Sequence, residues 1–380
     1  MDRVPFNVPP YLGIEQTYIK KVIESRKLCG DGEMTKACSR RLEEMTGVKK
    51  ALLTTSGSSA LDMAGILSKV GPGDEVILPS FTFSSTANAF ALRGAELVFI
   101  DIRPDTMNLD ETKIERAVTP KTKAIVPMHY GGVACEMDAI MELANRYGLL
   151  VIEDAAQSVM SAYHGRALGS IGQMGCFSFH ETKNYSMGEG GALLFGDESF
   201  VERAEVVREK GTDRSRFLRG QIDKYTWTDI GSSYLPSELN AAYLLAQLER
   251  ADRIYEDRMR SWDRYHEAFQ PLSARGCVER PTVPDGCRHN AHLYYLKTRD
   301  LAERTALIRH LNDKANVGAV FHYIPLHSAP AGKRLGRFDG EDVYTTRESE
   351  RLVRLPMFYG LTEAQVDRVV NGVYDFYASR

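Results

Sequence analysis

The sequence predicts an α/β fold, with a large domain built on a mostly parallel sheet sandwiched by helices and a smaller C-terminal α+β domain. Two observations lead to this prediction. Short apolar runs alternate with segments of helical periodicity, which is typical of βαβ units. The runs are continuous, as expected for parallel strands buried on both faces. Since 380 residues suffice for two domains, we expect residues 1–250 to form the first and 251–380 the second.

The elements of the large domain are expected in regular order. Strands are predicted over residues 51–53, 75–78, 96–100, 123–126 and 149–152, and helices over 59–70, 86–92 and 138–147. The last of these strands leads into the acidic pair Glu153 and Asp154. Because ligands bind beyond the carboxyl ends of parallel strands, the residues that follow each strand are the first candidates for a site.

The pattern changes after about residue 237. One long helix is predicted over residues 237–268, rich in Ala, Leu, Arg and Glu, as a connector into the second domain. Turn-rich sequence follows at residues 281–286, and then a strand over 292–296, a helix over 302–315 and a strand over 319–323. This mixture predicts the α+β character of the smaller domain.

Composition excludes several classes of protein. Hydrophobic residues make up 43% and charged residues 26%, with a net charge of -3 and both signs mixed, so no nucleic-acid partner is indicated. No run approaches the ~18 apolar residues of a membrane span, and no secretory h-region opens the sequence. Six scattered cysteines form no metal motif, so we expect free thiols, a cytoplasmic location and no metal.

Lys183 is the most informative single residue. It lies in Phe-Ser-Phe-His-Glu-Thr-Lys-Asn, residues 177–184, shortly before Gly-Glu-Gly-Gly at 188–191. A lysine amine enclosed by apolar groups loses part of its charge and attacks carbonyl carbons, as Schiff-base chemistry requires. From this segment alone, a solvated lysine at the end of an element is the simpler interpretation.

Other candidates follow the predicted strands. Gly57 and Ser58 open a helix, where backbone amides and hydroxyls bind phosphate or simply cap the helix. Phe83 is placed to stack on a flat ring or to enter the core. Asp154 follows a buried strand and needs a cationic partner, unless it caps the next turn; Gln157 is placed to bind a ring oxygen. Together with Lys183, these groups are what pyridoxal phosphate needs from a protein.

On these motifs the chain resembles the sugar aminotransferases of the DegT/DnrJ/EryC1/StrS family, which share fold type I of the pyridoxal-phosphate enzymes. The resemblance covers nearly the whole length. It is carried by Ser-Gly-Ser-Ser-Ala-Leu at 56–61, Glu-Asp-Ala-Ala-Gln at 153–157, the lysine segment with its glycines, and His-Tyr-Ile-Pro-Leu-His at 322–327.

The resemblance implies a role for each matching position. Lys183 would bond to pyridoxal phosphate and shuttle the proton, and Asp154 would keep the ring nitrogen protonated. Ring and phosphate contacts are implied for Gln157, Phe83, Gly57, Ser58 and Ser178. Where many relatives have an Asn that reaches the phosphate across a dimer interface, this chain has Ser233, so the contact from the partner subunit is either missing or made by a shorter side chain. A homodimer with shared active sites is therefore expected.

The resemblance also implies a reaction. L-Glutamate would donate its amine, leaving pyridoxamine phosphate, and the C4 ketone of a nucleotide-linked 4-keto-6-deoxy sugar would accept it. Residues 27–32, 209–212 and 223–234 resemble the group within the family that converts dTDP-4-dehydro-6-deoxy-D-glucose to dTDP-4-amino-4,6-dideoxy-D-galactose for lipopolysaccharide or common-antigen biosynthesis. Substrate contacts are implied for Lys210, Arg214, His322 and His327, each of which could instead be a solvated or packing residue.

Three alternatives stay open from the sequence. The first is the same chemistry on another keto sugar, with a C3 ketone or a UDP carrier. The second is a pyridoxal-phosphate sugar dehydratase, which in this family has His at the lysine position; here Lys183 is present, and His180 is interpreted as a neighbour. The third is a non-enzymatic binding protein, against which the complete set of cofactor residues argues.

Overall fold

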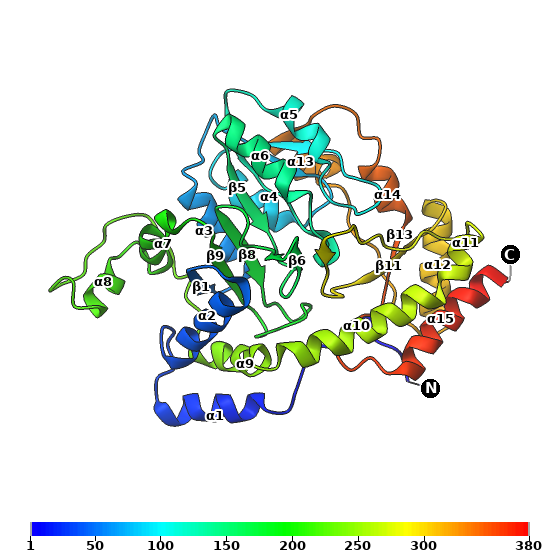
Figure 1. The fold of residues 1–380 in the computed structure, drawn as a ribbon, viewed down its shortest axis with the longest axis horizontal. Coiled ribbons are helices and arrows are strands. Elements are labelled where there is room, and N and C mark those ends of the chain that lie inside the picture. Colours follow the sequence, from blue (N-terminus) through cyan, green and yellow to red (C-terminus); the bar gives the residue numbers. More distant parts are fainter. Residues whose placement is uncertain (1, 379–380) are drawn as a thin grey trace.

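The computed structural model describes residues 2–378 and is drawn in Figure 1. Its centre is an eight-stranded sheet in which five neighbouring pairs are parallel, while β9 runs antiparallel to both of its neighbours. The spatial order is β1 (Lys50–Thr54), β9 (Gly191–Phe195), β8 (Met174–Ser178), β5 (Leu150–Asp154), β4 (Thr122–Ile125), β2 (Glu75–Pro79), β3 (Glu96–Ile100) and β12 (Gly336–Phe338). The predicted α/β class with a mostly parallel sheet is confirmed.

Helices cover both faces of this sheet. The first face carries α3 (Gly57–Leu67), α4 (Ser84–Ala91) and α7 (Val201–Arg208). The second carries α2 (Glu33–Thr46), α5 (Ile114–Ala117), α6 (Met137–Tyr147) and α9 (Glu238–Leu248), with α1 (Glu15–Ser25) packed outside α9. α8 (Arg214–Leu218) lies on a segment that projects from the body at the left of Figure 1.

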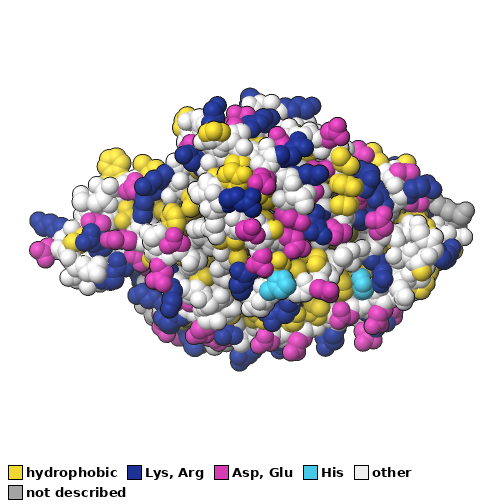
Figure 2. Space-filling model, turned by 45° about the horizontal axis from the view of Figure 1, so that its top comes forward, with side chains coloured by type: hydrophobic (Ala, Val, Ile, Leu, Met, Phe, Trp, Pro, Cys, Tyr) yellow, Lys and Arg dark blue, Asp and Glu magenta, His cyan; other side chains and the backbone are white. Residues whose placement is uncertain are grey.

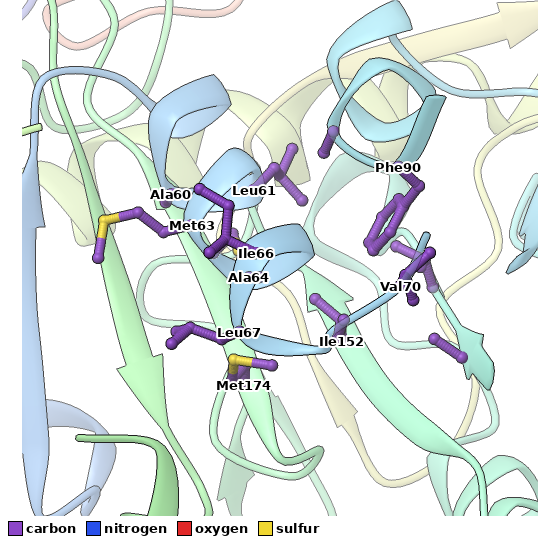
Figure 3. Close-up of a cluster of buried hydrophobic side chains, with 14 of the residues drawn as sticks. Ala60, Leu61, Met63, Ala64, Ile66, Leu67, Val70, Phe90, Ile152 and Met174 are labelled. Atoms are coloured by element: carbon purple, nitrogen blue, oxygen red, sulfur yellow. The ribbon is translucent and has the colours of Figure 1, made fainter. Parts of the chain in front are cut away.

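Side chains alternate between the two faces along each strand. In β2, Val76 and Leu78 join the cluster under α3 and α4, while Ile77 between them joins the cluster under α6. Figure 3 shows the first of these clusters, in which Leu61 and Phe90 pack with Ile152. Burial on both faces explains why the strands are continuous apolar runs in the sequence.

The C-terminal part contains helices and contributes strands to two small sheets. Its helices are α10 (Ala251–Ala268), α11 (Gln270–Ala274), α12 (Leu301–Asp313), α13 (Pro330–Leu335), α14 (Thr345–Arg351) and α15 (Glu363–Ala378). β11 (Tyr294–Lys297) pairs with β13 (Leu352–Leu355), and β10 (Cys287–Arg288) pairs with β6 (Ala162–Tyr163), which pairs with β7 (Arg166–Ala167). Short 3-10 turns occur at Glu111–Lys113, Tyr130–Gly132, Glu198–Phe200 and Leu326–Ser328. The division into domains at residue 250 stays a prediction.

Two sequence-based expectations differ from the structure. The single helix predicted over residues 237–268 is two helices, because Arg250 leaves the helical conformation (φ -124°, ψ 28°) and the Leu248 carbonyl accepts a hydrogen bond from Arg41 Nε at 3.3 Å. The strand predicted over 319–323 does not form; only Val320 pairs, in an isolated bridge with Arg354. Pro325, two residues after the predicted strand, has no N–H to donate to a ladder.

The surface agrees with the mixed composition. Figure 2 shows basic and acidic side chains interspersed over one face. Within residues 2–378, every helix is too short or too polar to cross a bilayer. The same residues contain no group of three or more His, Cys, Asp or Glu side chains that could hold a metal ion.

Glu153 is a structural carboxylate at the centre of the sheet. It is fully buried, and it accepts backbone hydrogen bonds from Gly169 (2.8 Å), Ile171 (2.7 Å) and Gly172 (2.7 Å). Its other contact is Nε2 of the equally buried His129, at 3.0 Å. Glu153 thus holds the connection between β7 and β8 against β5.

We predict that Glu153→Ala lowers the free energy of unfolding by about 3 to 5 kcal/mol, because three enclosed N–H groups lose their acceptor. Urea denaturation followed by circular dichroism measures this change. Glu142→Ala, on an exposed face of α6 where the side chain is 78% exposed, is the matched control and should stay within about 0.5 kcal/mol of the parent. A loss below about 1 kcal/mol for Glu153→Ala would contradict the structural role.

Candidate active site

A cavity of about 600 Å³ lies at the carboxyl ends of β1, β2, β5 and β8. These ends coincide because Thr54 and Ser178 both pair with Gly191 of β9, and Asp154 pairs with Cys176 of β8. The residues that line it after these strands are Ser56, Gly57, Ser58, Phe83, Ser85, Asp154, Ala156, Gln157, Ser178, His180, Thr182, Lys183 and Glu189; the far wall comes from the N-terminal segment and the C-terminal part.

Lys183 stands on the turn between β8 and β9. Its backbone N–H donates to the His180 carbonyl at 2.9 Å, which fixes the turn, and its side chain is partly exposed only because it borders the cavity. Burial of the amine among protein atoms lowers the pKa of Lys183 to about 8; the charge of Asp154 raises this pKa and that of Arg354 lowers it. About a tenth of the amine is therefore neutral at pH 7, and nucleophilic attack requires this neutral form.

Asp154 presents a carboxylate to the same cavity. The residue is 4% exposed, and its side chain accepts hydrogen bonds from Thr86 Oγ1 (2.6 Å) and the Ala156 N–H (3.1 Å). No basic side chain within residues 2–378 forms an ion pair with it. A buried carboxylate of this kind fits a protonated pyridine nitrogen, because such a ring supplies the missing positive charge.

The start of α3 forms an anion cradle beside Ser178. The Ser59 N–H is capped by Ser56 Oγ (2.9 Å), and the first intrahelical bond runs from the Ala60 N–H to the Ser56 carbonyl (3.1 Å). The amides of Gly57 and Ser58 precede these bonds, where a helix N-terminus attracts phosphate. A Cβ on Gly57 would lie 2.8 Å from Ser178 Cβ, so only glycine allows this close approach. The cradle, Asp154 and Lys183 together fit pyridoxal phosphate.

Phe83 and Gln157 complete the predicted cofactor set. Phe83 is 58% exposed and borders the cavity, with its ring centroid 6.4 Å from that of Tyr323. Gln157 is 4% exposed; its side-chain oxygen accepts from the Gly131 N–H at 2.7 Å, and its amide nitrogen lies 3.3 Å from the Tyr323 hydroxyl. Its orientation is thus fixed by protein contacts.

Of the remaining predicted site residues, one lines the cavity and the others lie outside it. His322 lines the cavity. His327 lies outside it, with Nδ1 2.7 Å from Ser80 Oγ and Nε2 3.2 Å from Asp342. Lys210 and Arg214 lie in the projecting segment that also carries the exposed Ser233, and both are ion-paired with Glu209, at 3.7 and 3.3 Å. Lys210, Arg214, Ser233 and His327 do not line the cavity of their own chain.

The cavity is also lined by Arg354, Phe6 and His292, which were not predicted from the sequence. Arg354 is the single charged residue in the otherwise apolar run Leu-Val-Arg-Leu that forms β13, and this was the available signal. Burial lowers the pKa of His292 far below its usual value, so the imidazole is neutral, and its Nδ1 lies 2.9 Å from the side-chain oxygen of Asn184 next to Lys183.

Comparison with known proteins gives a consistent result. The model of the DegT/DnrJ/EryC1/StrS aminotransferase family matches residues 13–374. The spore coat polysaccharide biosynthesis protein SpsC of Bacillus subtilis is 35% identical over 98% of this chain and 96% of its own length. The GDP-perosamine synthase of Caulobacter vibrioides is 33% identical over 97% of each chain.

A solved structure gives the same result at the level of the fold. The putative sugar aminotransferase Spr1654 from Streptococcus pneumoniae, in its PLP form, superposes with a TM-score of 0.91 and 25% identity over 99% of both chains. Its PMP form superposes equally well, with a TM-score of 0.91. The similarity extends over the whole chain, including the C-terminal part that closes the cavity.

The lowered pKa of Lys183 predicts how the apoprotein captures pyridoxal phosphate. Only the neutral amine attacks the aldehyde, so the rate of covalent capture should rise with pH and level off above about 8. Stopped-flow absorbance of the apoprotein mixed with cofactor measures this rate from pH 6 to 10. A rate that still rises tenfold per pH unit at pH 9.5, as for an ordinary lysine, would disprove the assignment.

Proposed function

The chain belongs to the DegT/DnrJ/EryC1/StrS aminotransferase family, and on this basis we propose that it transfers the amino group of L-glutamate to the C4 ketone of a nucleotide-linked 4-keto-6-deoxy sugar. It is a pyridoxal-phosphate-dependent sugar aminotransferase. The observation that carries the proposal is the pairing, in one cavity, of a lysine of lowered pKa with a buried carboxylate that has no protein cation as partner.

The proposed substrate is dTDP-4-dehydro-6-deoxy-D-glucose and the product dTDP-4-amino-4,6-dideoxy-D-galactose. Support comes from the resemblance of residues 27–32, 209–212 and 223–234 to enzymes of that specificity. Incorporation of the amino sugar into a cell-surface polysaccharide, such as lipopolysaccharide or common antigen, is supported by the similarity to a spore coat polysaccharide protein. Activity in the cytoplasm is part of this proposal.

The side chains of the site divide the work of the reaction. When bound, pyridoxal phosphate supplies an electron sink for the carbanion that forms when the donor loses its α-proton. Lys183, whose amine is partly neutral at neutral pH, would be the base that takes up that proton and later gives it back. Asp154 stabilises the positive charge on the ring nitrogen. Gly57, Ser58 and Ser178 hold the phosphate, while Phe83 and Gln157 orient the ring.

Several predicted contacts require a second subunit. Ser233, Lys210 and Arg214 lie together on the projecting segment, away from the cavity of their own chain. We propose that this segment reaches the cavity of a second copy in a homodimer, where Ser233 contacts the phosphate and the two cations contact the nucleotide. His322 would contact the substrate in the cavity of its own chain. His327, which is held by Ser80 and Asp342, is also proposed as a substrate contact.

The substrate assignment predicts a defined outcome with a panel of keto sugars. The protein incubated with L-glutamate should add an amine to dTDP-4-dehydro-6-deoxy-D-glucose, with ping-pong kinetics because the two half-reactions are separate. Mass spectrometry detects the amine, and NMR gives its position and configuration. A preference for a 3-keto or UDP-linked sugar would replace the proposed substrate by the alternative one.

Lys183→Ala tests the chemistry itself. The variant should bind pyridoxal phosphate without the near-visible absorbance of the lysine adduct, and amine transfer should fall by at least about a thousandfold, because the proton is no longer removed by a positioned base. Lys20→Ala, which removes an exposed lysine of α1, is the control and should behave as the parent. A normal absorbance band in Lys183→Ala would exclude Lys183 as the cofactor lysine.

Ser233 tests the shared site. Ser233→Ala should weaken binding of pyridoxal phosphate roughly 3- to 10-fold through loss of one hydroxyl hydrogen bond, whereas Ser233→Asn should retain affinity. Equilibrium dialysis gives the affinities, and analytical ultracentrifugation gives the oligomeric state. Ser199→Ala, an exposed position, serves as control. A monomer with full cofactor affinity, or a Ser233→Ala protein identical to the parent, would argue against the contact from the partner subunit.

A further inference from the structure

Two buried threonines connect the carboxylate of Asp154 to the segment that carries Phe83. Thr86 lies in the first turn of α4, and Thr82 lies two residues before that helix begins. Thr86 Oγ1 is 2.6 Å from Asp154 Oδ2 and 2.8 Å from Thr82 Oγ1. Thr82 is 1% exposed, Thr86 is fully buried, and neither residue lines the cavity. Any effect of the two hydroxyls on a ligand is therefore exerted through Asp154.

The protons of the two hydroxyls are assigned by matching donors with acceptors. Each threonine hydroxyl has one proton to donate. With Asp154 ionised, Thr86 donates to the carboxylate and Thr82 donates to Thr86, so both protons are used. A proton on Asp154 Oδ2 would reverse this chain and leave the Thr82 proton without an acceptor among residues 2–378. Because an enclosed donor without an acceptor is costly, the hydroxyl chain stabilises the ionised carboxylate.

Asp101 shows how a structural carboxylate is bound in the same molecule. Its donors are the N–H groups of residues 102 and 343–345 and the hydroxyl of Thr345. Within the described chain, the donors to Asp154 are Thr86 Oγ1 and the Ala156 N–H, one for each oxygen. Since an ionised carboxylate accepts at roughly four positions, Asp154 keeps about half of its acceptor capacity for a ligand in the cavity that it lines.

The hydroxyl of Thr86 influences where a proton shared with Asp154 would lie. A hydrogen bond donated to a carboxylate favours its charged form, so removal of that bond makes the carboxylate a better proton acceptor. When pyridoxal phosphate is bound, the ring nitrogen and Asp154 compete for one proton, and the protonated ring is the stronger electron sink. Donation from Thr86 therefore favours the proton on the ring nitrogen.

We propose that Thr86, supported by Thr82, is a positioning residue that keeps Asp154 ionised and thereby keeps the proton on the cofactor's ring nitrogen. This inference rests on the role of Asp154 in the proposed aminotransferase. The chain also fixes the orientation of the carboxylate, because Thr86 holds Oδ2 while the Ala156 N–H holds Oδ1. Phe83 lies between the two threonines in the sequence, so one short segment supplies a ring contact and the support for the acidic partner.

The test loads the parent protein and its variants with pyridoxal phosphate that carries nitrogen-15 in the ring. In Thr86→Val, which keeps nearly the shape of threonine without the hydroxyl, the nitrogen resonance should move toward that of an unprotonated ring. Thr86→Ser keeps the donor and should stay near the parent. Thr82→Val should give a smaller shift in the same direction, because Thr86 then loses the hydrogen bond that polarises its own hydroxyl.

The rate of the half-reaction with L-glutamate provides a second measurement. It should fall roughly 10- to 100-fold in Thr86→Val, as expected for loss of one hydrogen bond to a charged group, and recover in Thr86→Ser. Thr345→Val is the matched control, since it removes a buried hydroxyl that donates to Asp101, also at 2.6 Å. Neither Thr345 nor Asp101 lines the cavity, so this variant should keep the parent's resonance and rate.

Asp154→Asn separates this inference from the proposed function. A shifted resonance in Asp154→Asn but not in Thr86→Val would overturn the hydroxyl chain and leave the role of Asp154 standing. No shift in either variant would contradict the role of Asp154 itself, and the inference with it. An equal shift in Thr345→Val and Thr86→Val would indicate a general loss of packing and also overturn the chain. Should Thr86→Val fail to fold, Thr82→Val decides, because its shift against an unshifted Thr345→Val is required by the same chain.

Discussion

The parallel pairing of β5 with β8 is the constraint on which the site depends. It places Asp154 opposite Cys176, so that both strands end at the same edge of the sheet. The turn that follows β8 then carries Lys183 to the side of the cavity that Asp154 already lines. Antiparallel pairing here would send the two ends to opposite edges and separate the amine from the carboxylate. The amine and the carboxylate can therefore act together only because β5 and β8 run in the same direction.

Buried charged residues of the site differ from their structural neighbours in whether the protein supplies partners for their charge. Glu153 and Asp154 are adjacent, yet successive strand residues point to opposite faces. Glu153 meets backbone donors and His129 in the core, whereas Asp154 faces the cavity and forms no ion pair with a basic side chain of the described residues. Incomplete pairing of buried charge marks the groups that await a ligand.

The sheet and the cofactor side of the site could largely be predicted from the sequence. Buried parallel strands give continuous apolar runs, and the residues that follow their carboxyl ends, such as Asp154, are the candidates for ligand binding. The strand predicted over residues 319–323 was wrong because only Val320 finds a bridge partner and the side chains of residues 320–323 line the cavity. The place of Arg354 in the wall of the cavity was not predictable, since it depends on parts of the chain far from it in the sequence. The contacts of His327 with Ser80 and Asp342 could not be predicted either, because they join residues that are far apart in the sequence or in different elements.

The N-terminal segment gives the molecule an order of assembly. Val4 bridges Val317, and Phe6 lies under Arg354, so these residues are held by residues that follow more than three hundred positions later in the chain. At synthesis rates of roughly 5–20 residues per second, these partners leave the ribosome only after tens of seconds. All strands of the central sheet except β12 have been synthesised well before then. At that stage the wall of the cavity that Phe6 and the C-terminal part form is still absent.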